Sequence, residues 1–290
     1  IDTIYITTSR SYFGFFREAL LLFLAKLFKI RVVNHLHGSD FKSFFNSNKL
    51  LKILLTPLYN HISKSIVLLD RMKDQYEQFP NMNIEVVSNC YDPIYENEVI
   101  DFNAKSGILY LSNIMFSKGI LDFLDSLNIV LANCNSDVFI AGKILGDYLK
   151  TEKDIEDMFF KKLKKLNKLF NNRVKYLGVV EGFEKMKLLK KTSIFCLPTF
   201  YKTEAFPLSI IEAMVLGNAI ITTDHNYLPS IISDENGAIV PISNIEKLSQ
   251  SMISLLDNPS LLSIQKNNVD FARKNYSYSN FKGNIKRILA

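Results

Sequence analysis

Two glutamates lie close together in the stretch "TEAFPLSIIEAM", residues 203–214. A buried-strand pattern, "SIFCLPTF", comes before them and a second strand pattern, "GNAIITTD", comes after them, which predicts a strand, a loop, a helix and a strand in that order. Pro207 suits the first helical turn, and Gly217 suits the carboxyl-terminal cap. We therefore expect Glu204 in the loop and Glu212 about one and a half turns inside the helix.

The start of this helix has the chemistry of a phosphate site. Open parallel sheets bind ligands beyond the carboxyl ends of their strands, and helix amino termini there offer free N–H groups to anions. Backbone donors at Phe206, Leu208 and Ser209 would hold a diphosphate, while carboxylates beside them would accept hydrogen bonds from sugar or ribose hydroxyls. The pattern favours a sugar nucleotide over a bare phosphate. The alternative is that Glu204 and Glu212 are surface residues stabilised by the positive end of the helix dipole.

A second loop places a lysine between the end of a predicted strand and the start of a predicted helix. In "ILYLSNIMFSKGILDFLDSL", a strand over residues 108–112 is followed by a polar loop, and Lys118 and Gly119 open an amphipathic helix. A lysine in such a loop is usually solvated. Near a second phosphate-suited helix start, Lys118 becomes a candidate diphosphate clamp.

A histidine ends one of the strands of the first region. His37 and Gly38 follow the strand-like run "RVVNHL", and this position is at the edge of a parallel sheet where ligands bind. The alternative is that His37 only satisfies the end of the strand. His35, His61 and His225 are expected to be structural or exposed.

The elements that position these residues alternate between strand-like runs and helical segments, which predicts parallel α/β architecture. A polar seam without apolar periodicity, residues 88–106, is the expected interdomain linker. The region from about Ser106 to Asn258 contains a full series of βα units. The first region holds only about four strands, so its opening βα unit is expected to be missing. We predict domains over residues 1–100 and 101–258, and a helical tail over 259–290 that reaches back to the first domain.

Composition excludes several classes of protein. The chain of 290 residues is 48% hydrophobic and 22% charged, as in ordinary globular domains, and no apolar run reaches the roughly 18 residues of a membrane span. Its cysteines are far apart without CxxC spacing, which suits a reducing cytoplasm; they are Cys90, Cys134 and Cys196. The net charge of +6 comes largely from a lysine-rich segment within residues 159–175, which predicts a solvated helix face and no nucleic-acid partner.

Together these motifs resemble the retaining GT-B glycosyltransferases of family 4, also called glycosyl transferases group 1. The E-x7-E motif of that family matches Glu204 and Glu212, and its G-R-L-x-x-x-K-G loop matches "SNIMFSKG". Its "PNGVD" linker matches "SNCYD", and its "HG" strand end matches His37 and Gly38. The resemblance implies two Rossmann-like doubly wound domains facing a cleft, the first of them incomplete here.

The resemblance also implies roles for individual residues. Glu204 would contact donor-sugar hydroxyls, Glu212 the ribose, and Lys118 the diphosphate, with His37 approaching the donor sugar and the acceptor. The implied catalytic residues are His37, Lys118 and Glu204. The implied donor-binding residues are Asn113, Lys118, Glu204, Ala205, Phe206, Pro207, Leu208, Ser209 and Glu212, and the implied acceptor-side residues are His37, Gly38, Ser39 and Asp40.

The chain departs from the family pattern at three points. Asn113 stands where an arginine usually accompanies the clamp lysine, "DHNYLPSII" replaces the usual "GG-P-E" segment, and the glycine-rich loop of the first βα unit has no counterpart. No DxD motif is present to hold Mg²⁺, so we expect no metal and no other cofactor, with Lys118 and the helix start stabilising the leaving diphosphate.

The implied function is transfer of a sugar, with retention, from a nucleotide sugar to a glycan or lipid-linked acceptor in bacterial surface polysaccharide or lipopolysaccharide synthesis. Alternatives are a catalytically silent nucleotide-sugar-binding or scaffold protein, a GT-B-like sugar-nucleotide epimerase, and a glycoside hydrolase that pairs the two glutamates. The segment "SYFGFFREALLLFLAKLFK" adds the hypothesis of peripheral contact with the inner face of the cytoplasmic membrane.

Overall fold

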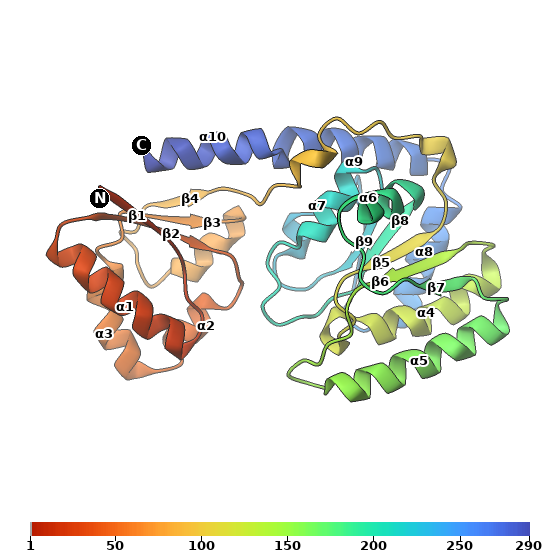
Figure 1. The fold of residues 1–290 in the computed structure, drawn as a ribbon, viewed down its shortest axis with the longest axis horizontal. Helices are drawn as coiled ribbons and strands as arrows, with labels where there is room; N and C mark the ends of the chain where they lie inside the picture. The colour runs from red at the N-terminus through yellow and green to blue at the C-terminus, as the bar shows by residue number, and fades with distance from the viewer. Residues whose placement is uncertain (1) are drawn as a thin grey trace. The chain divides into compact units, whose positions relative to one another are not determined.

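The computed structural model describes residues 2–290, except for the side chain of residue 51. Contacts divide the chain into two compact units (Figure 1). The first unit comprises the residues up to Asn89 together with Lys202–Phe206 and Tyr278–Ala290, and the second comprises Cys90–Tyr201 and Pro207–Ser277. Each unit is built around its own parallel sheet, as the α/β prediction requires.

The first unit has a four-stranded parallel sheet in the order β1-β2-β3-β4. Helices α1, α2 and α3 lie on one face of this sheet and α10 lies on the other (Figure 1). The elements are β1 (Thr3–Thr7), α1 (Tyr12–Leu27), β2 (Arg31–Leu36), α2 (Phe41–Asn46), α3 (Lys49–Tyr59), β3 (Lys64–Val67), β4 (Ile84–Val86) and α10 (Tyr278–Leu289).

Two apolar cores hold the first unit together. Beneath α1, the rings of Phe15, Phe41, Phe45 and Tyr59 contact one another at centroid distances of 5.4 to 6.4 Å. On the other face, buried Ile288 of α10 joins a cluster of three residues from the sheet and the segment that follows it, Val33, Ile66 and Val87. Helix α10 therefore completes the core of this unit.

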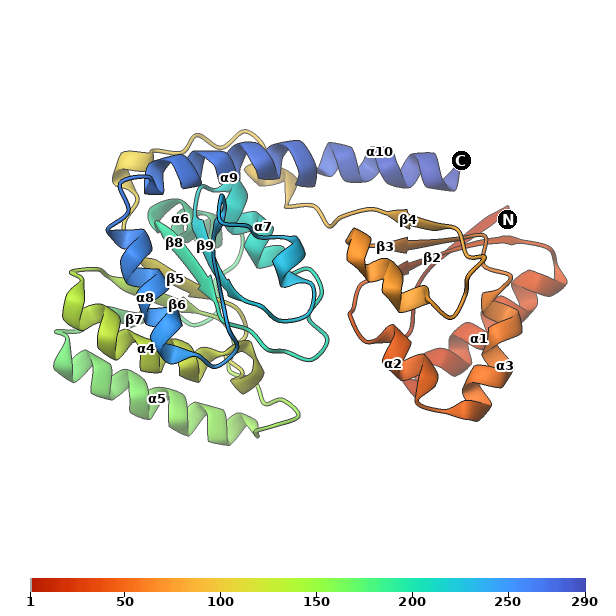
Figure 2. The ribbon, with the colours of Figure 1, turned by 180° about the vertical axis from the view of Figure 1, so that it is seen from behind.

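The second unit has a six-stranded parallel sheet in the order β10-β9-β8-β5-β6-β7. Helices α4, α5 and α8 cover one face and α6, α7 and α9 cover the other (Figures 1 and 2). The elements are β5 (Ile108–Leu111), α4 (Ile120–Asn133), β6 (Val138–Ala141), α5 (Glu152–Leu169), β7 (Val174–Tyr176), α6 (Gly182–Lys191), β8 (Ile194–Leu197), α7 (Leu208–Val215), β9 (Ala219–Thr223), β10 (Gly237–Val240), α8 (Ile245–Leu256) and α9 (Leu261–Tyr276).

The compact units do not coincide with the domains expected from the sequence. The change between units falls at Asn89 and Cys90, within the expected linker and before residue 100. The segment expected to be one tail over residues 259–290 is divided, since α9 packs on α7 in the second unit whereas α10 belongs to the first. Among the residues described, no helix combines the length and the apolar composition needed to cross a bilayer.

Candidate nucleotide-sugar site

In the second sheet, the direction in which the chain adds successive strands reverses at the boundary between β5 and β8. These strands are direct neighbours, with Ile108 opposite Ile194 and Leu109 opposite Phe195. From β5 the chain proceeds to β6 and β7 on one side, and from β8 it proceeds to β9 and β10 on the other. Such a point is where open parallel sheets bind ligands, beyond the carboxyl ends of the two strands.

The loops that leave β5 and β8 are joined at this point. The Phe200 N–H donates to the Ser117 carbonyl at 2.8 Å, and the rings of Phe116 and Phe200 meet edge to face at 5.5 Å. The Lys118 ammonium lies 4.8 Å from the centroid of the Tyr201 ring, a favourable cation–π position. The two loops that carry Lys118 and the E-x7-E stretch are thus connected by several contacts inside the second unit.

The backbone conformation at residue 119, directly after Lys118, requires glycine. Its φ is +75°, in the left-handed region, and it serves as the N-cap of α4. A Cβ atom there would lie 1.9 Å from the carbonyl oxygen of Pro198, at the end of β8. A larger residue would push the two loops apart, so Gly119 fixes the approach of the Lys118 loop.

Asp147 holds this loop from its other side, and sequence reasoning missed it. Its carboxylate accepts hydrogen bonds from the backbone N–H of Ser117 at 2.7 Å and from those of Leu149 and Lys150 at 2.8 and 3.0 Å. Burial raises the pKa of Asp147, but these hydrogen bonds more than compensate and the pKa lies below its usual value. Asp147 is therefore a charged support for the loop that carries Lys118.

Helix α7 begins without a side-chain cap. Pro207 is its N-cap, one residue earlier than the first-turn position expected from the sequence, and no acidic residue occupies the first turn. Leu208 is half exposed and Ser209 partly exposed. The first N–H groups of a helix have no partner within the helix, so such groups at the start of α7 can donate hydrogen bonds to an anion.

Glu212 is buried on α7 and paired with a lysine that sequence reasoning missed. The glutamate is only 8% exposed, and the Lys185 ammonium of α6 donates to its carboxylate at 2.8 Å. Burial raises the pKa of Glu212, against the opposing effect of Lys185. For Lys185, burial lowers the pKa but the bond to Glu212 prevails and raises it. Lys185 also lies 5.9 Å from the ring centroid of Tyr95.

His37 lies just beyond β2 in the first unit, on top of a second histidine. The rings of His35 and His37 are 4.1 Å apart, and the Tyr5 hydroxyl is 2.6 Å from Nδ1 of His35. Burial and then nearby Arg10 lower the pKa of His37, while burial and His37 lower that of His35 to about 3. Both imidazoles are therefore neutral at pH 7.

Arg10 contacts the residues that follow His37, and sequence reasoning missed it. Its guanidinium pairs with Asp40 at 2.5 Å, and a Cβ at Gly38 would lie 1.9 Å from one of its nitrogen atoms. Gly38 thus leaves room for the Arg10 side chain. The Ser39 hydroxyl donates to the Lys202 carbonyl at 3.2 Å.

The loop between β8 and α7 is divided between the units. Lys202–Phe206, which contains Glu204, groups with the first unit, whereas Pro207 and the residues of α7 group with the second. The Asn89 side chain donates to the Phe206 carbonyl at 3.0 Å. Glu204, Ala205 and Phe206 are all buried. Asn113 is exposed, and its backbone carbonyl accepts a hydrogen bond from the Tyr110 hydroxyl at 3.3 Å.

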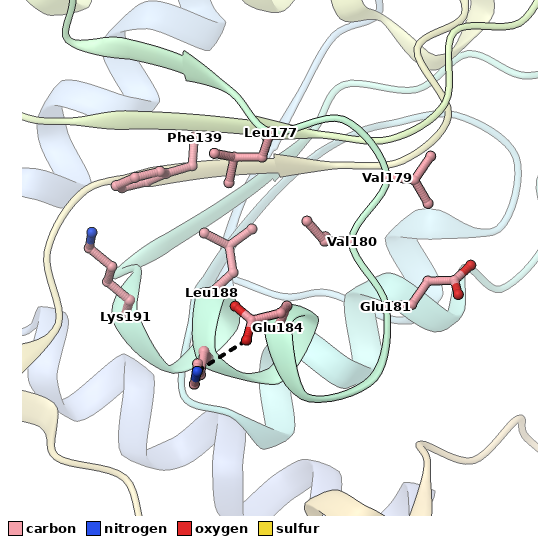
Figure 3. A pocket seen from close by; sticks show the side chains of 9 residues that line it. Phe139, Leu177, Val179, Val180, Glu181, Glu184, Leu188 and Lys191 are labelled. Atoms are coloured by element: carbon pink, nitrogen blue, oxygen red, sulfur yellow. Dashed lines mark hydrogen bonds and ion pairs between the residues drawn. The ribbon is translucent and has the colours of Figure 1, made fainter.

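A separate pocket of about 480 Å³ lies beside α6 in the second unit. Figure 3 shows Phe139 and Leu177 on the sheet side of this pocket and Leu188 on the α6 side. An ion pair between Glu184 and Lys187 at 3.0 Å lies at its edge. None of the predicted site residues lines this pocket.

Similar solved structures identify the architecture. The crystal structure of Anabaena HepE in complex with UDP matches this chain with a TM-score of 0.78 and 16% identity, covering 99% of this chain and 78% of that one. Sucrose-phosphate synthase from Thermosynechococcus elongatus matches with a TM-score of 0.73 and 15% identity, covering 99% and 73%. The fold is that of the GT-B glycosyltransferases.

The family follows from the sequence itself. The family model described as "Glycosyl transferases group 1" matches residues 98–274, more than half of the chain, and the chain belongs to this family. An uncharacterized glycosyltransferase of Haemophilus influenzae is 26% identical over 249 residues, which cover 84% of this chain and 66% of that protein. The poly(glycerol-phosphate) alpha-glucosyltransferase of Bacillus subtilis is 35% identical over 130 residues, covering 43% and 16%. The match therefore spans just under two thirds of the length of the Haemophilus protein and about a sixth of the length of the Bacillus protein.

Proposed function

We propose that this chain is a retaining, metal-independent glycosyltransferase. It would move a sugar from a nucleotide-diphosphate sugar to a glycan or lipid-linked acceptor in the synthesis of a bacterial surface polysaccharide or lipopolysaccharide, in the cytoplasm at the inner face of the membrane. The observation that carries the proposal is the switch point between β5 and β8, where the Lys118 loop and the uncapped start of α7 occur together.

In this proposal the second unit binds the nucleotide part of the donor. Lys118 and the first N–H groups of α7 contact the diphosphate, and Glu212 accepts hydrogen bonds from the ribose hydroxyls. Negative charge grows on the diphosphate as the glycosidic bond to it breaks, so preorganised donors there stabilise the transition state more than the ground state. Asn113, Pro207, Leu208 and Ser209 complete the proposed donor site.

Other predicted residues are proposed to recognise the sugar and the acceptor. Glu204 accepts from hydroxyls of the donor sugar, with Ala205 and Phe206 beside it. His37, held neutral by its lowered pKa, can donate and accept hydrogen bonds without adding charge. Gly38, Ser39 and Asp40 form the rest of the proposed acceptor side.

The choice of UDP as the first probe comes from the related proteins. HepE was crystallised with UDP and with UDP-glucose, and a Campylobacter jejuni relative, 26% identical over 170 residues, is named as a transferase acting on a diphospho-undecaprenol sugar. These names describe those proteins. They support a nucleotide-sugar donor and a lipid-linked acceptor as the first substrates to test here.

Calorimetric titration tests the donor site. We expect one of UDP, GDP, ADP and their sugar conjugates to bind with the same affinity in EDTA and in Mg²⁺. Glu212→Gln should weaken that binding at least about tenfold, because a neutral amide is a poorer acceptor for two hydroxyls. Glu184→Gln, an exposed change on α6, is the matched control. Absence of binding across the panel, or a strict need for Mg²⁺, would refute the assigned site.

Turnover separates the enzyme from its alternatives. With a binding nucleotide sugar and a lipid-linked acceptor, NMR of the product should show the anomeric configuration of the donor. An inverted product would overturn retention. Binding without transfer under these conditions would instead identify a silent nucleotide-sugar-binding or scaffold protein, and isomerisation of the free nucleotide sugar would identify an epimerase.

A further inference from the structure

Helix α1 is apolar on both sides. Its inner face packs into the core of the first unit through residues such as Phe15 and Leu22. Its outer face carries large apolar side chains at the i, i+3, i+4 and i+7 spacings that form one stripe. The members of this stripe are between 42% and 85% exposed: Phe13, Phe16, Leu20, Phe23, Leu24 and Leu27.

Helix α3 extends this apolar surface. Leu50, Ile53 and Leu54 share one side of α3 and are 71%, 62% and 63% exposed. The two helices are neighbours on the same side of the first sheet (Figure 1), and the Lys26 ammonium lies 3.5 Å from the Pro57 carbonyl. We call the outer stripes of α1 and α3 together the α1–α3 surface. Large exposed apolar side chains gathered on neighbouring helices are typical of an interaction site.

The exposed charged side chains of α1 and α3 themselves are all basic. Residues 12–59 contain two acidic side chains, of which Glu18 is buried and Asp40 is ion-paired with Arg10. Several basic residues in the same range are exposed; they are Arg17, Lys26, Lys29, Lys49 and Lys52. An exposed apolar stripe bordered by lysine and arginine, with no exposed carboxylate, is the pattern of a helix that lies in the headgroup region of an anionic bilayer.

Helix α5 offers an internal comparison. It has six lysines, against three on α1 and α3 together, but it also carries four acidic residues, Glu152, Asp154, Glu156 and Asp157. Its residues Ile155, Phe159 and Leu166 are buried, whereas Phe160 and Leu169 are exposed. Helix α5 therefore combines mixed charge with few large exposed apolar side chains, unlike the α1–α3 surface.

We propose that the α1–α3 surface binds an anionic lipid bilayer, with its phenylalanine and leucine side chains inserted at the headgroup boundary and its basic residues on lipid phosphates. This inference rests on the proposed function, because a lipid-linked acceptor would lie in the bilayer to which the α1–α3 surface binds. A bilayer is favoured over a second copy of the chain, because a two-fold dimer through this surface would bring the two basic rims together.

Vesicle flotation tests the proposal with the 290-residue chain. The protein should float with vesicles of phosphatidylglycerol and phosphatidylethanolamine and not with phosphatidylcholine alone, and high salt should weaken the binding. Phe13→Ser with Leu20→Ser should lower partitioning at least about tenfold. The control, Leu169→Ser with Leu262→Ser, changes two exposed leucines of the second unit and should have no effect.

A second pair of variants separates charge from apolar contact. Arg17→Gln with Lys49→Gln should weaken flotation about tenfold, whereas Lys164→Gln with Lys165→Gln on α5 should leave it unchanged. Equal effects of the two pairs would mean nonspecific charge attraction and would overturn the assignment to the α1–α3 surface. Absence of flotation by the wild type would overturn the proposal outright, and a dimer that the Phe13→Ser, Leu20→Ser change dissociates would replace the bilayer by a second copy.

The outcome is independent of the donor site. Nucleotide binding is measured by calorimetry without lipid, so flotation without nucleotide binding contradicts only the proposed function. Nucleotide binding without flotation contradicts only the α1–α3 proposal. Circular dichroism of each variant shows that a loss of flotation is not a loss of folding.

Discussion

Lys185→Met should destabilise the second unit by removing the partner of a buried carboxylate. Glu212 and Lys185 have side chains 10% and 25% exposed, with a nitrogen-to-oxygen distance of 2.8 Å. At an effective dielectric constant of about 20, two charges at this distance attract by about 6 kcal/mol, most of which is offset by their desolvation. Breaking a fully buried pair costs about 3–5 kcal/mol. Because water can reach part of the Lys185 site, we expect a cost of about 2 kcal/mol.

The pH dependence distinguishes the ion pair from lost packing. The pKa of Glu212 is raised above its ordinary value of 4.5, so the folded chain binds this proton more tightly than the unfolded chain. The stabilisation from the tighter proton binding at Glu212 is fully present below the unfolded pKa. It is lost as the pH rises through the folded pKa, where the buried carboxyl group ionises. Lys185 limits that loss. The effect of Lys185→Met should be largest at pH 7.5 and should diminish below pH 4.5.

The assay is urea unfolding followed by circular dichroism, with two matched variants. Lys187→Met, on the same helix, removes an exposed partner of Glu184 and should cost about 0.5 kcal/mol or less. Lys185→Met combined with Glu212→Gln should recover much of the loss, since no charge is left unpaired. If Lys185→Met is no more harmful than Lys187→Met, or equally harmful at pH 4 and 7.5, the ion-pair reasoning is wrong.

Three further changes test polar and backbone contacts within the second unit. Lys105→Met should cost about 3 kcal/mol in thermal or urea unfolding, because the buried ammonium donates to three carbonyls at the ends of α6 and α7, at 2.8, 3.1 and 2.9 Å; a cost below about 1 kcal/mol would contradict this role. Asp147→Asn should cost about 1–2 kcal/mol at pH 7 and weaken nucleotide binding several-fold. Since the pKa of Asp147 is lowered, its contribution is present above the unfolded pKa and is lost as the pH falls through the folded pKa, so the wild type and the variant should converge once the pH is below the folded pKa. Gly119→Ala should be destabilising by at least about 2 kcal/mol because of its positive φ and the clash with Pro198, whereas Gly283→Ala, where a Cβ meets nothing within 4 Å inside α10, should be neutral or stabilising by up to about 1 kcal/mol; similar results at both glycines would refute the clash.

Much of the fold could be predicted because its strands are short, apolar and separated by helices. Among residues 2–290, nine of the ten strands coincide with strand-like runs in the sequence, such as "RVVNHL" at β2 and "SIFCLP" at β8. The strand missed is β10, Gly237–Val240, which is only four residues long and follows the polar segment "SDENG". Its pairing with β9 is a tertiary contact that local propensity does not encode. The division of the tail between two units likewise depends on packing, since α9 and α10 are both amphipathic helices in sequence.

The candidate site divides in the same way between local and non-local information. The boundaries of the loops and helices that carry the candidate residues could be predicted, because Gly119, Pro207 and Gly217 are residue types typical of turns and helix ends. The partners Lys185, Asp147 and Arg10 could not. No sequence pattern distinguishes these three charged residues from others in the chain. Each meets its partner only through tertiary structure, either because two helices lie on the same face of a sheet or because one loop packs on another. Lys185 and Glu212 are 27 residues apart and meet because α6 and α7 cover the same face of the sheet.

The pairing of Lys185 with Glu212 gives the E-x7-E motif a requirement that the motif does not contain. In the proposed donor site Glu212 accepts from ribose hydroxyls, and an ionised carboxylate is a stronger acceptor than a neutral carboxyl group, yet burial on α7 raises the pKa of Glu212 and favours its neutral form. The opposing effect comes from Lys185, on a different helix. Without a cation at this position, the pKa of Glu212 would rise further. If Glu212 binds the donor as proposed, the affinity for the donor should therefore depend on residue 185 as well as on the two glutamates.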